Sequence, residues 1–470
     1  MNYGLRASLS KSGRLAFLLP PAFVMMLVAL YAVDVPYWDT WDWLDRHYPA
    51  DPDGSASAVR RYWPLFNDHR VFVPLIVDRL LFWASGIDIL PRILVKLPLS
   101  MGTLWLTLRL ARQTTPAPTL PWLAAGLACL AFPLTYWPMW IDPRQFSIHI
   151  VVLAMMAALV AATSGRRPGT RALLSGVACA VASLSYAPGL LTWPFVGLVL
   201  WYHPPRPSVA VLAVWLACAT VAGGLQAFDL RDGATQSAAA APDVLAAGGA
   251  ALAIAGLPVA PALSRLAYLP TRVVGLCGLV ALPCLVLMAW RLGGDARMRA
   301  LPWIALGGWG ASYAVATGWA RGGLALGALH DPRFAYLAAQ LWVALAALLS
   351  QQAGRQQPVS GRPLLRRRVT AVVGIALAMS YGVASLRPFL ATGGVGRFSA
   401  TLETGRVCLQ SFRTANDACL ALLYPAPSRL REIAARLQTH GAAFLPPAPP
   451  QPGETSRTQR DPLHQGQHGE

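Results

Sequence analysis

The sequence has 470 residues, of which 55% are hydrophobic and 13% charged, with a mean hydropathy of +0.45 and a formal net charge of +18. A soluble globular protein carries about 25% charged residues, so this composition excludes a cytosolic enzyme, a disordered protein and a disulfide-rich secreted domain. Apolar runs of about 20 residues, the length that crosses about 30 Å of hydrocarbon, recur along the chain. We therefore expect an all-α polytopic membrane protein.

About eleven transmembrane helices (roughly 9–13) are predicted by this length criterion. The loops that this arrangement assigns to the cytoplasm hold 17 Lys and Arg against one acid, as the positive-inside rule predicts. The excess positive charge therefore encodes topology and does not indicate a nucleic-acid partner. We expect a bacterial inner-membrane protein with a cytoplasmic N-terminus and a periplasmic C-terminal tail. The predicted spans are 15–33, 92–108, 119–137, 146–163, 172–187, 189–202, 208–226, 270–290, 301–320, 334–351 and 369–386.

One apolar stretch, 243–262, is not counted as a span. If it crossed the membrane, Arg291, Arg297 and Arg299 would lie outside, against the charge rule. It is therefore interpreted as an outer-face or re-entrant helix.

The stretch 71–87 is also apolar, but Asp78 and Arg79 lie at its centre. Each such charge costs roughly 2.5–3.5 kcal/mol at mid-bilayer, so a helix lying at the interface is expected. Segments 172–187 and 189–202 are short and separated by a Pro-Gly pair. They are interpreted either as two spans or as a hairpin that does not fully cross.

Ionisable residues are concentrated in the first periplasmic loop, which holds nine of the 21 acids. If its densest part begins a short helix, Asp39, Asp42 and Asp45 share one face at spacing i, i+3, i+6, with Trp38 and Trp41 on an adjacent face at headgroup level. Such carboxylates can hold a divalent cation, or one can act as a general base toward a hydroxyl. The alternative is an interfacial helix with a solvated acidic face.

Arginines at the same predicted face offer partners for an anion. His69 and Arg70 follow in the first loop, and Arg321 and Arg333 flank a later outer loop. The guanidinium fork matches phosphate geometry, so a lipid-linked phosphate is one expected ligand. The alternatives are snorkelling arginines paired with Asp or with phospholipid.

The second outer loop, 137–145, reads WPMWIDPRQ and contains Asp142 and Arg144. It is interpreted as an aromatic belt, or alternatively as the lining of a sugar-sized cleft.

The tail from 388 to 445 is expected to form a small periplasmic helical segment, with a helix starting at Pro427 and capped by Ser428. Residues 446–470 are rich in Pro, Gln, Gly and His and are expected to be disordered. Cys408 and Cys419 lie in the tail, where a disulfide and two free thiols are equal alternatives. The span-bearing domain is expected to cover 1–387, with its large first loop at 34–91.

Three short motifs together resemble the membrane-embedded glycosyltransferases of the C-type fold, most closely an uncharacterised bacterial branch. Members of that branch typically read W-D-E-W soon after the first span, then N-E-H-R, then a late G-R…R-Y. The corresponding stretches here are Trp38-Asp39-Thr40-Trp41, Asn67-Asp68-His69-Arg70, and Arg321-Gly322 followed by Arg333-Phe334-Ala335-Tyr336. Beyond these residues the resemblance rests on the general layout of an anchor helix, a large acidic loop and about ten further spans.

The resemblance implies a glycosyltransferase that moves a sugar from a polyprenyl-phosphate donor to a glycan, lipid or protein acceptor at the periplasmic face. It implies that Asp39, with Asp42 as the next candidate, acts as base or holds Mg²⁺ or Mn²⁺. It further implies lipid-phosphate binding by His69, Arg70, Arg321, Arg333 and Tyr336. Two departures matter: Thr40 replaces an acid, which puts metal binding in doubt, and two residues separate Arg333 from Tyr336.

Other functions are weighed against this one. The sequence contains no P-loop, HExxH or GxSxG motif, so ATP-driven transport and zinc proteolysis lack support. A lipid-linked sugar transporter or flippase is the main alternative, but it requires polar groups along the bundle interior. A polymerase or ligase acting on lipid-linked oligosaccharide is a third.

Overall fold

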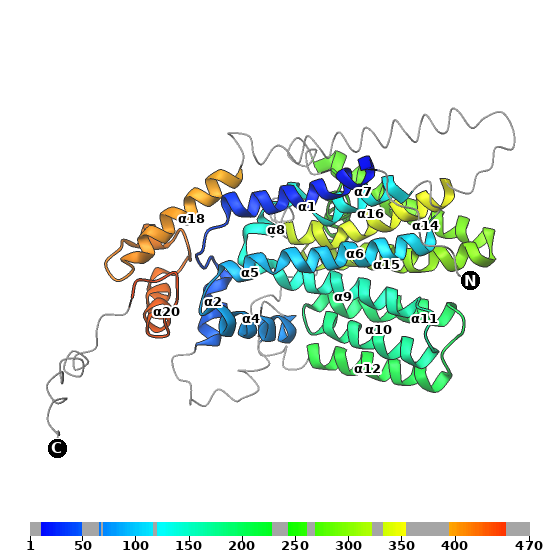
Figure 1. The fold of residues 1–470 in the computed structure, drawn as a ribbon, viewed down its shortest axis with the longest axis horizontal. Helices are drawn as coiled ribbons and strands as arrows, with labels where there is room; N and C mark the ends of the chain where they lie inside the picture. The colour runs from blue at the N-terminus through cyan, green and yellow to red at the C-terminus, as the bar shows by residue number, and fades with distance from the viewer. Residues whose placement is uncertain are drawn as a thin grey trace, which may run out of the picture.

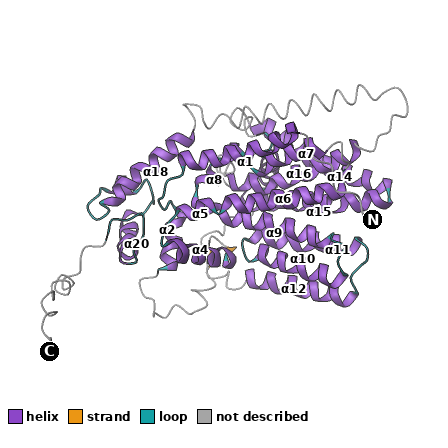
Figure 2. Cartoon of the chain, in the orientation of Figure 1, coloured by secondary structure: helices purple, strands orange, loops and turns teal. Residues whose placement is uncertain are grey.

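The computed structural model describes residues 11–48, 65–66, 69–115, 120–227, 243–260, 268–321, 332–353 and 394–447. Helices dominate this part of the chain, and its strands are one antiparallel pair, β1 (Leu65–Phe66) and β2 (His69–Arg70) (Figure 2). The architecture is that of a helical membrane protein, as the composition predicts. The predicted span 369–386 and the tail after residue 447 lie outside the described residues.

The long helices lie side by side in a bundle (Figure 1). Five segments of the described chain are long and apolar enough to cross a membrane: Leu90–Thr114, Pro143–Ala162, Val209–Ala227, Leu269–Leu292 and Arg333–Gln352. The predicted count of eleven spans stays a prediction. The helices of the bundle are α1 (Lys11–Tyr31), α6 (Lys96–Thr114), α7 (Leu120–Ala131), α9 (Phe146–Ala162), α10 (Pro168–Ser183), α11 (Thr192–Tyr202), α12 (Val209–Ala227), α14 (Tyr268–Leu292), α15 (Gly294–Arg321) and α16 (Pro332–Ala353).

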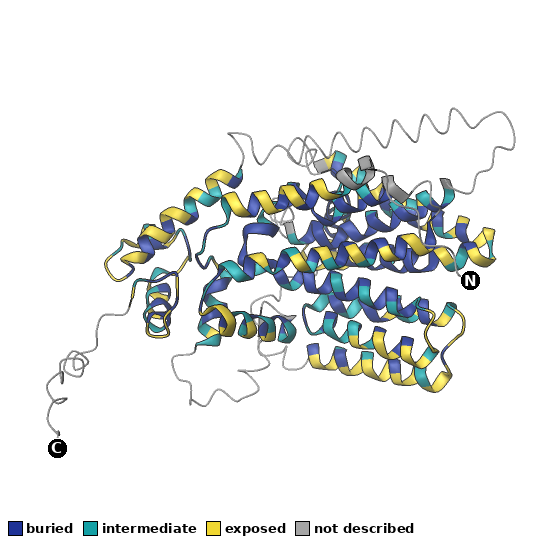
Figure 3. Ribbon diagram, viewed as in Figure 1, coloured by how far each residue is buried: buried dark blue, intermediate teal, exposed yellow. Residues whose placement is uncertain are grey.

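Helices α9 and α12 are both apolar around their whole circumference, yet they lie in different places. In the segment Pro143–Ala162, which contains α9, 78% of the most apolar stretch is buried. In α12 only 17% of the most apolar stretch is buried. A helix that is apolar all round belongs in the interior of a bundle or in lipid. Accordingly, α9 lies inside the bundle and α12 at its edge, where apolar side chains are exposed (Figure 3).

Helix α13 (Val244–Gly256) is too short to span. Its 13 residues extend about 20 Å, against the roughly 30 Å of a hydrocarbon core. It packs against α14 so closely that a Cβ on Gly256 or Gly275 would lie 1.9 Å from a backbone oxygen of the other helix. Such small-residue packing is common between membrane helices, and the outer-face or re-entrant placement of this helix stays a prediction.

The predicted break between 172–187 and 189–202 is confirmed. Helix α10 ends at Ser183, a 3₁₀ turn η4 (Ala187–Leu191) follows, and α11 begins at Thr192. A Cβ at Gly189 would lie 2.0 Å from the Ala182 carbonyl oxygen, so the chain can turn back this tightly only at glycine.

Loop elements gather at one end of the bundle (Figure 1). From the first loop come α2 (Asp39–His47), α4 (Phe72–Ser85) and α5 (Leu90–Leu94), and from the second come η2 (Leu134–Tyr136), α8 (Pro138–Ile141) and η3 (Pro143–Gln145). The 14 residues of α4 are too few to span, which agrees with the interfacial helix predicted over 71–87.

A small cap, residues 394–447, lies at the same end and contacts α2 (Figure 1). It contains α18 (Gly394–Gln410), α19 (Asp417–Leu420) and α20 (Pro427–Thr439). The predicted cap by Ser428 is wrong. Helix α20 begins at Pro427 with Ala426 in the N-cap position and no side-chain cap, because proline is preset for the first helical position.

Candidate functional site

The predicted acidic helix forms as α2, and Asp39 is its first residue. Asp39 and Asp42 lie in the first turn, where carboxylates are favoured by the helix dipole. The residue before the helix, Trp38, has φ 47°, a left-handed conformation that is rare for a bulky side chain. Trp41 is completely buried in the protein and donates from Nε1 to the Pro36 carbonyl at 3.0 Å; its level in the membrane stays a prediction.

Asp39 faces an arginine of the second outer loop. The Arg144 Nη1 lies 3.7 Å from Asp39 Oδ2, and both side chains remain partly exposed, at 24% and 29%. Arg144 is itself held by Asp142, whose two carboxylate oxygens lie 2.9 Å from Arg144 Nε. Its guanidinium also lies over the Tyr37 ring, 5.4 Å from the centroid. A cation is thus fixed beside a partly exposed carboxylate, an arrangement that can bind an anion and accept a proton at neighbouring points.

The electrostatics of Asp142 follow from this pairing. Burial alone would raise the pKa of Asp142, but the charge and hydrogen bonds of Arg144 outweigh it and hold the pKa below its usual value. Asp142 therefore stays ionised at neutral pH and keeps Arg144 in place.

Lys96 of α6, which the sequence shows as an isolated charge in a span, supports the loop 137–145 that carries Asp142 and Arg144. It is completely buried, and its Nζ donates to the carbonyls of Met139 at 2.9 Å and Asp142 at 2.8 Å. These are carbonyls at the end of the short helix α8, which would otherwise lack donors. Lys96 thus fixes the turn that carries Asp142 and Arg144. Its functional connection was missed, although a lone lysine in a span is itself a signal of a specific role.

One helical turn further along α6, the polar groups continue into the bundle. Ser100 Oγ lies 2.8 Å from His149 Nδ1 and 3.3 Å from the Tyr336 hydroxyl. All three side chains are buried, and the His149 and Tyr336 rings lie 4.7 Å apart. Tyr336, predicted to bind lipid phosphate, therefore lies in the bundle interior within a hydrogen-bonded group.

Asp42 and Asp45 face the cap. The Tyr424 hydroxyl donates to Asp42 Oδ1 at 2.5 Å. Arg429 Nη2 lies 2.5 Å from Asp45 Oδ2, and Arg436 pairs with the other oxygen. Burial, together with the hydrogen bond to Asp42, raises the pKa of Tyr424 to about 12, so this phenol stays a donor. Of the three carboxylates predicted to share a face, Asp39 is the one that pairs with the second outer loop.

The opposite side of α2 contacts α4 through His47. Asp78 of α4 is completely buried, with Arg92 Nε at 2.8 Å from one oxygen and His47 Nε2 at 3.9 Å from the other. The Arg92 guanidinium also lies over the rings of Trp43 and Phe146. Burial lowers the pKa of His47 by more than Asp78 raises it, so His47 is neutral at pH 7.

The other predicted phosphate-binding residues are spread over the end of the bundle. Arg70 is buried, and its backbone N–H and carbonyl both bond the Gln226 amide at 3.0 Å. Arg321 is exposed at the end of α15, and Arg333 is half-buried at the start of α16 with its guanidinium over the Phe334 ring. The His69 side chain lies outside the described part of the molecule.

The divalent cation expected at Asp39 and Asp42 stays a prediction. Mg²⁺ and Mn²⁺ require oxygen ligands free to point at one centre. Here Arg144 stands beside Asp39, Asp42 accepts from Tyr424, and no group of three acidic, histidine or cysteine side chains converges within the described ranges. The site is therefore described through its own residues.

Comparisons with known proteins give one structural likeness. No protein-family model matches the sequence, and no curated protein matches it. Among solved structures, the chain is similar to the archaeal oligosaccharyltransferase AglB from Archaeoglobus fulgidus, determined in complex with an inhibitory peptide and a dolichol-phosphate, with a TM-score of 0.46 and 14% identity. The match covers 87% of this chain and 59% of that one.

Proposed function

We propose that this protein is a membrane glycosyltransferase that moves a sugar from a polyprenyl-phosphate donor to an acceptor hydroxyl at the periplasmic face. The observation that carries the proposal is the carboxylate–guanidinium pair of Asp39 and Arg144 at one end of an apolar bundle, partly exposed on both sides. A base and a cation side by side are what glycosyl transfer from a phosphate needs. The apolar helices around them suit a donor with a long lipid tail.

The proposed reaction breaks the bond between the anomeric carbon and the phosphate oxygen and forms one to the acceptor oxygen. Asp39 takes the acceptor proton, and the phosphate leaves with the bonding electrons as polyprenyl phosphate. Arg144 stabilises the developing negative charge, because Asp142 and Lys96 hold its loop in place before the donor binds. Arg70, Arg321 and Arg333 remain proposed contacts to the lipid phosphate.

The test is transfer of labelled sugar by the purified protein from a panel of polyprenyl-phosphate hexoses and pentoses. Asp39→Asn should lower the rate by about 10²–10⁴-fold, the usual contribution of a general base, at unchanged expression. The matched control is Asp42→Asn, one turn away, whose amide oxygen can still accept from Tyr424. It should keep transfer within a few-fold of the parent. Equal activity of Asp39→Asn and the parent would overturn the assignment of the base.

A flippase for lipid-linked sugars is the second candidate, favoured by the buried polar group of Ser100, His149 and Tyr336 inside the bundle. In reconstituted vesicles a flippase moves the labelled donor between leaflets without releasing polyprenyl phosphate. Movement without release, unaffected by Asp39→Asn, would favour this alternative over transfer.

A further inference from the structure

Two consecutive residues of the cap, Leu423 and Tyr424, contact α2. Their contacts fall on either side of Asp39. The Leu423 carbonyl accepts from the Trp38 backbone N–H at 2.8 Å, and the next residue, Tyr424, donates its hydroxyl to Asp42. These bonds join positions more than 380 residues apart in sequence. The cap therefore holds the first turn of α2 at the residue before the proposed base and at the third residue after it.

The bond to Trp38 supports an unusual backbone. At φ 47° the Trp38 side chain crowds its own backbone. Such a backbone conformation persists only where contacts with the surrounding structure hold it in place. The Trp38 side chain is 44% exposed, so packing around the indole holds it only partly. The Leu423 carbonyl is a fixed acceptor for the N–H of this residue, and it thereby helps to set the direction in which Asp39 leaves the turn.

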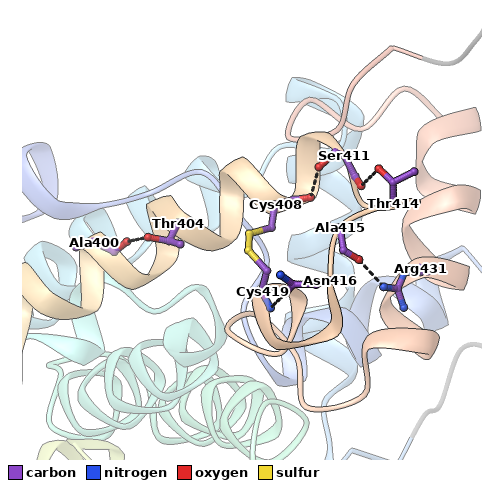
Figure 4. The surroundings of a disulfide bond; sticks show 9 residues. All are labelled: Ala400, Thr404, Cys408, Ser411, Thr414, Ala415, Asn416, Cys419 and Arg431. Atoms are coloured by element: carbon purple, nitrogen blue, oxygen red, sulfur yellow. Dashed lines mark hydrogen bonds between the residues drawn. A yellow bond between two sulfur atoms is a disulfide. The ribbon is translucent and has the colours of Figure 1, made fainter.

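The segment of the cap that makes these contacts is itself tied down. A disulfide joins Cys408 of α18 to Cys419 of α19, with the Cα atoms 6.0 Å apart (Figure 4). Arg431 of α20 donates to the Ala415 carbonyl at 2.7 Å within the closed loop. Leu423 follows four residues after Cys419 and is completely buried in the cap. Its carbonyl is therefore presented from a rigid segment.

A second contact joins the cap to the end of α2. Arg429 and Arg436, one on each side of the Asp45 carboxylate, both come from α20. Together with Leu423 and Tyr424 they hold α2 at both its ends. On the far side of the helix, His47 lies 3.9 Å from Asp78 of α4.

We propose that the C-terminal cap is the positioning element of the site: it holds α2 so that Asp39 faces Arg144, with Leu423 and Tyr424 as the positioning residues. Its catalytic consequence rests on the proposed glycosyl transfer, whereas the docking itself does not. In this proposal the cap does not contact the reacting atoms. It acts through its hydrogen bonds to Trp38 and Asp42.

The experiment compares full-length parent with the double variant Tyr424→Phe/Arg436→Gln and with a variant lacking the disulfide, Cys408→Ser/Cys419→Ser. Hydrogen–deuterium exchange of the amides of residues 38–47 should quicken about tenfold in the double variant, because two partly exposed contacts to α2 are lost. Exchange in α9 should stay unchanged. The disulfide variant should quicken exchange in the same window, since the segment that leads to Leu423 is no longer tied to α18 at Cys419.

Sugar transfer gives the second measurement. In the double variant kcat should fall about tenfold, as small misplacements of a catalytic group do, with the donor KM within twofold of the parent. The control is Arg406→Gln, an exposed cap residue paired with Glu403, which should change neither exchange nor transfer. The same loss in Arg406→Gln as in the double variant would overturn the proposal.

The two hypotheses fail in different ways. If the parent transfers no sugar from any donor, the proposed function fails while the exchange data still decide whether the cap holds α2. If exchange of α2 is the same in parent and double variant, or if it quickens while kcat is unchanged, the cap does not position Asp39 and the proposal is overturned.

Discussion

Two ion pairs of different character lie on either side of α2. On one side, Asp78 of α4 and Arg92 of α5, which meet α2 through His47, are buried to 0% and 3% exposure. On the cap side, Asp45 pairs with Arg429, which is 47% exposed. Removing one partner of a buried pair costs about 3–5 kcal/mol because a charge is left in a poorly polarisable environment, whereas an exposed pair is worth about 0–1 kcal/mol. The buried pair therefore fixes how α4 and α5 pack beside α2, whereas the exposed pair on the cap side contributes little to stability.

The strongest test of this contrast is Arg92→Met, which strands the Asp78 carboxylate. We expect a loss of about 3–5 kcal/mol in the free energy of unfolding, measured by denaturation of the protein in detergent. The double variant Asp78→Leu/Arg92→Met should recover most of it, because no buried charge remains. A single variant as stable as the parent would contradict the buried pair.

A smaller loss is expected for Lys96→Met. This change keeps the volume of the side chain but leaves the Met139 and Asp142 carbonyls without their donor, at a cost of about 1–3 kcal/mol. Thr107→Val on the same helix is the control, since the Thr107 hydroxyl donates to a carbonyl of its own helix. Equal stability of the two variants would mean that Lys96 does not support the second loop.

The strained turn before α2 can be measured by comparing Trp38→Gly with Trp38→Ala. Both remove the indole, and they differ in their tolerance of φ 47°. Glycine adopts positive φ freely, whereas alanine pays about 1–2 kcal/mol for it. We therefore expect Trp38→Gly to unfold at the higher denaturant concentration, and the reverse order would argue against a left-handed Trp38.

The smallest effect is a dependence of stability on pH at the junction of α1 and α5. Burial raises the pKa of Asp34 from its ordinary 3.8 to about 6, and the nearby Asp88 adds to the shift. A raised pKa means that the fold favours the protonated acid, so this contribution is present below about pH 4 and is lost as the pH rises through about 6. The melting temperature should fall over that window in the parent and fall less in Asp34→Asn; identical pH profiles would contradict the shift.

The sequence predicted several local features, although not the start of α20, where no side chain caps the helix. The acids at 39, 42 and 45 form a helix, the Pro-Gly pair at 188–189 breaks one, and the stretch 71–87 forms a helix too short to span. Each of these depends on spacing, turn residues or the cost of charge within one segment, which are visible in the chain itself.

The partners of these groups were not predictable in the same way. Asp39 meets Arg144, Asp78 meets Arg92, and Asp42 meets Tyr424, pairs whose members come from different loops or helices. Tyr336 was expected to bind a lipid phosphate because of its place in a motif. In the structure it lies on α16 in the bundle interior, beside Ser100. Local spacing carries no information on which loops meet, because the packing of distant helices decides it.

The contacts between the cap and α2 have a consequence for biosynthesis. Synthesis runs from the N-terminus, so the helix that carries Asp39 leaves the ribosome early, while Leu423 and Tyr424 are added more than 380 residues later. Until then the turn at Trp38 lacks its acceptor. A nascent or shortened chain can therefore insert its helices and still lack an assembled site, so that activity begins only after Leu423 and Tyr424 have been added and folded against α2.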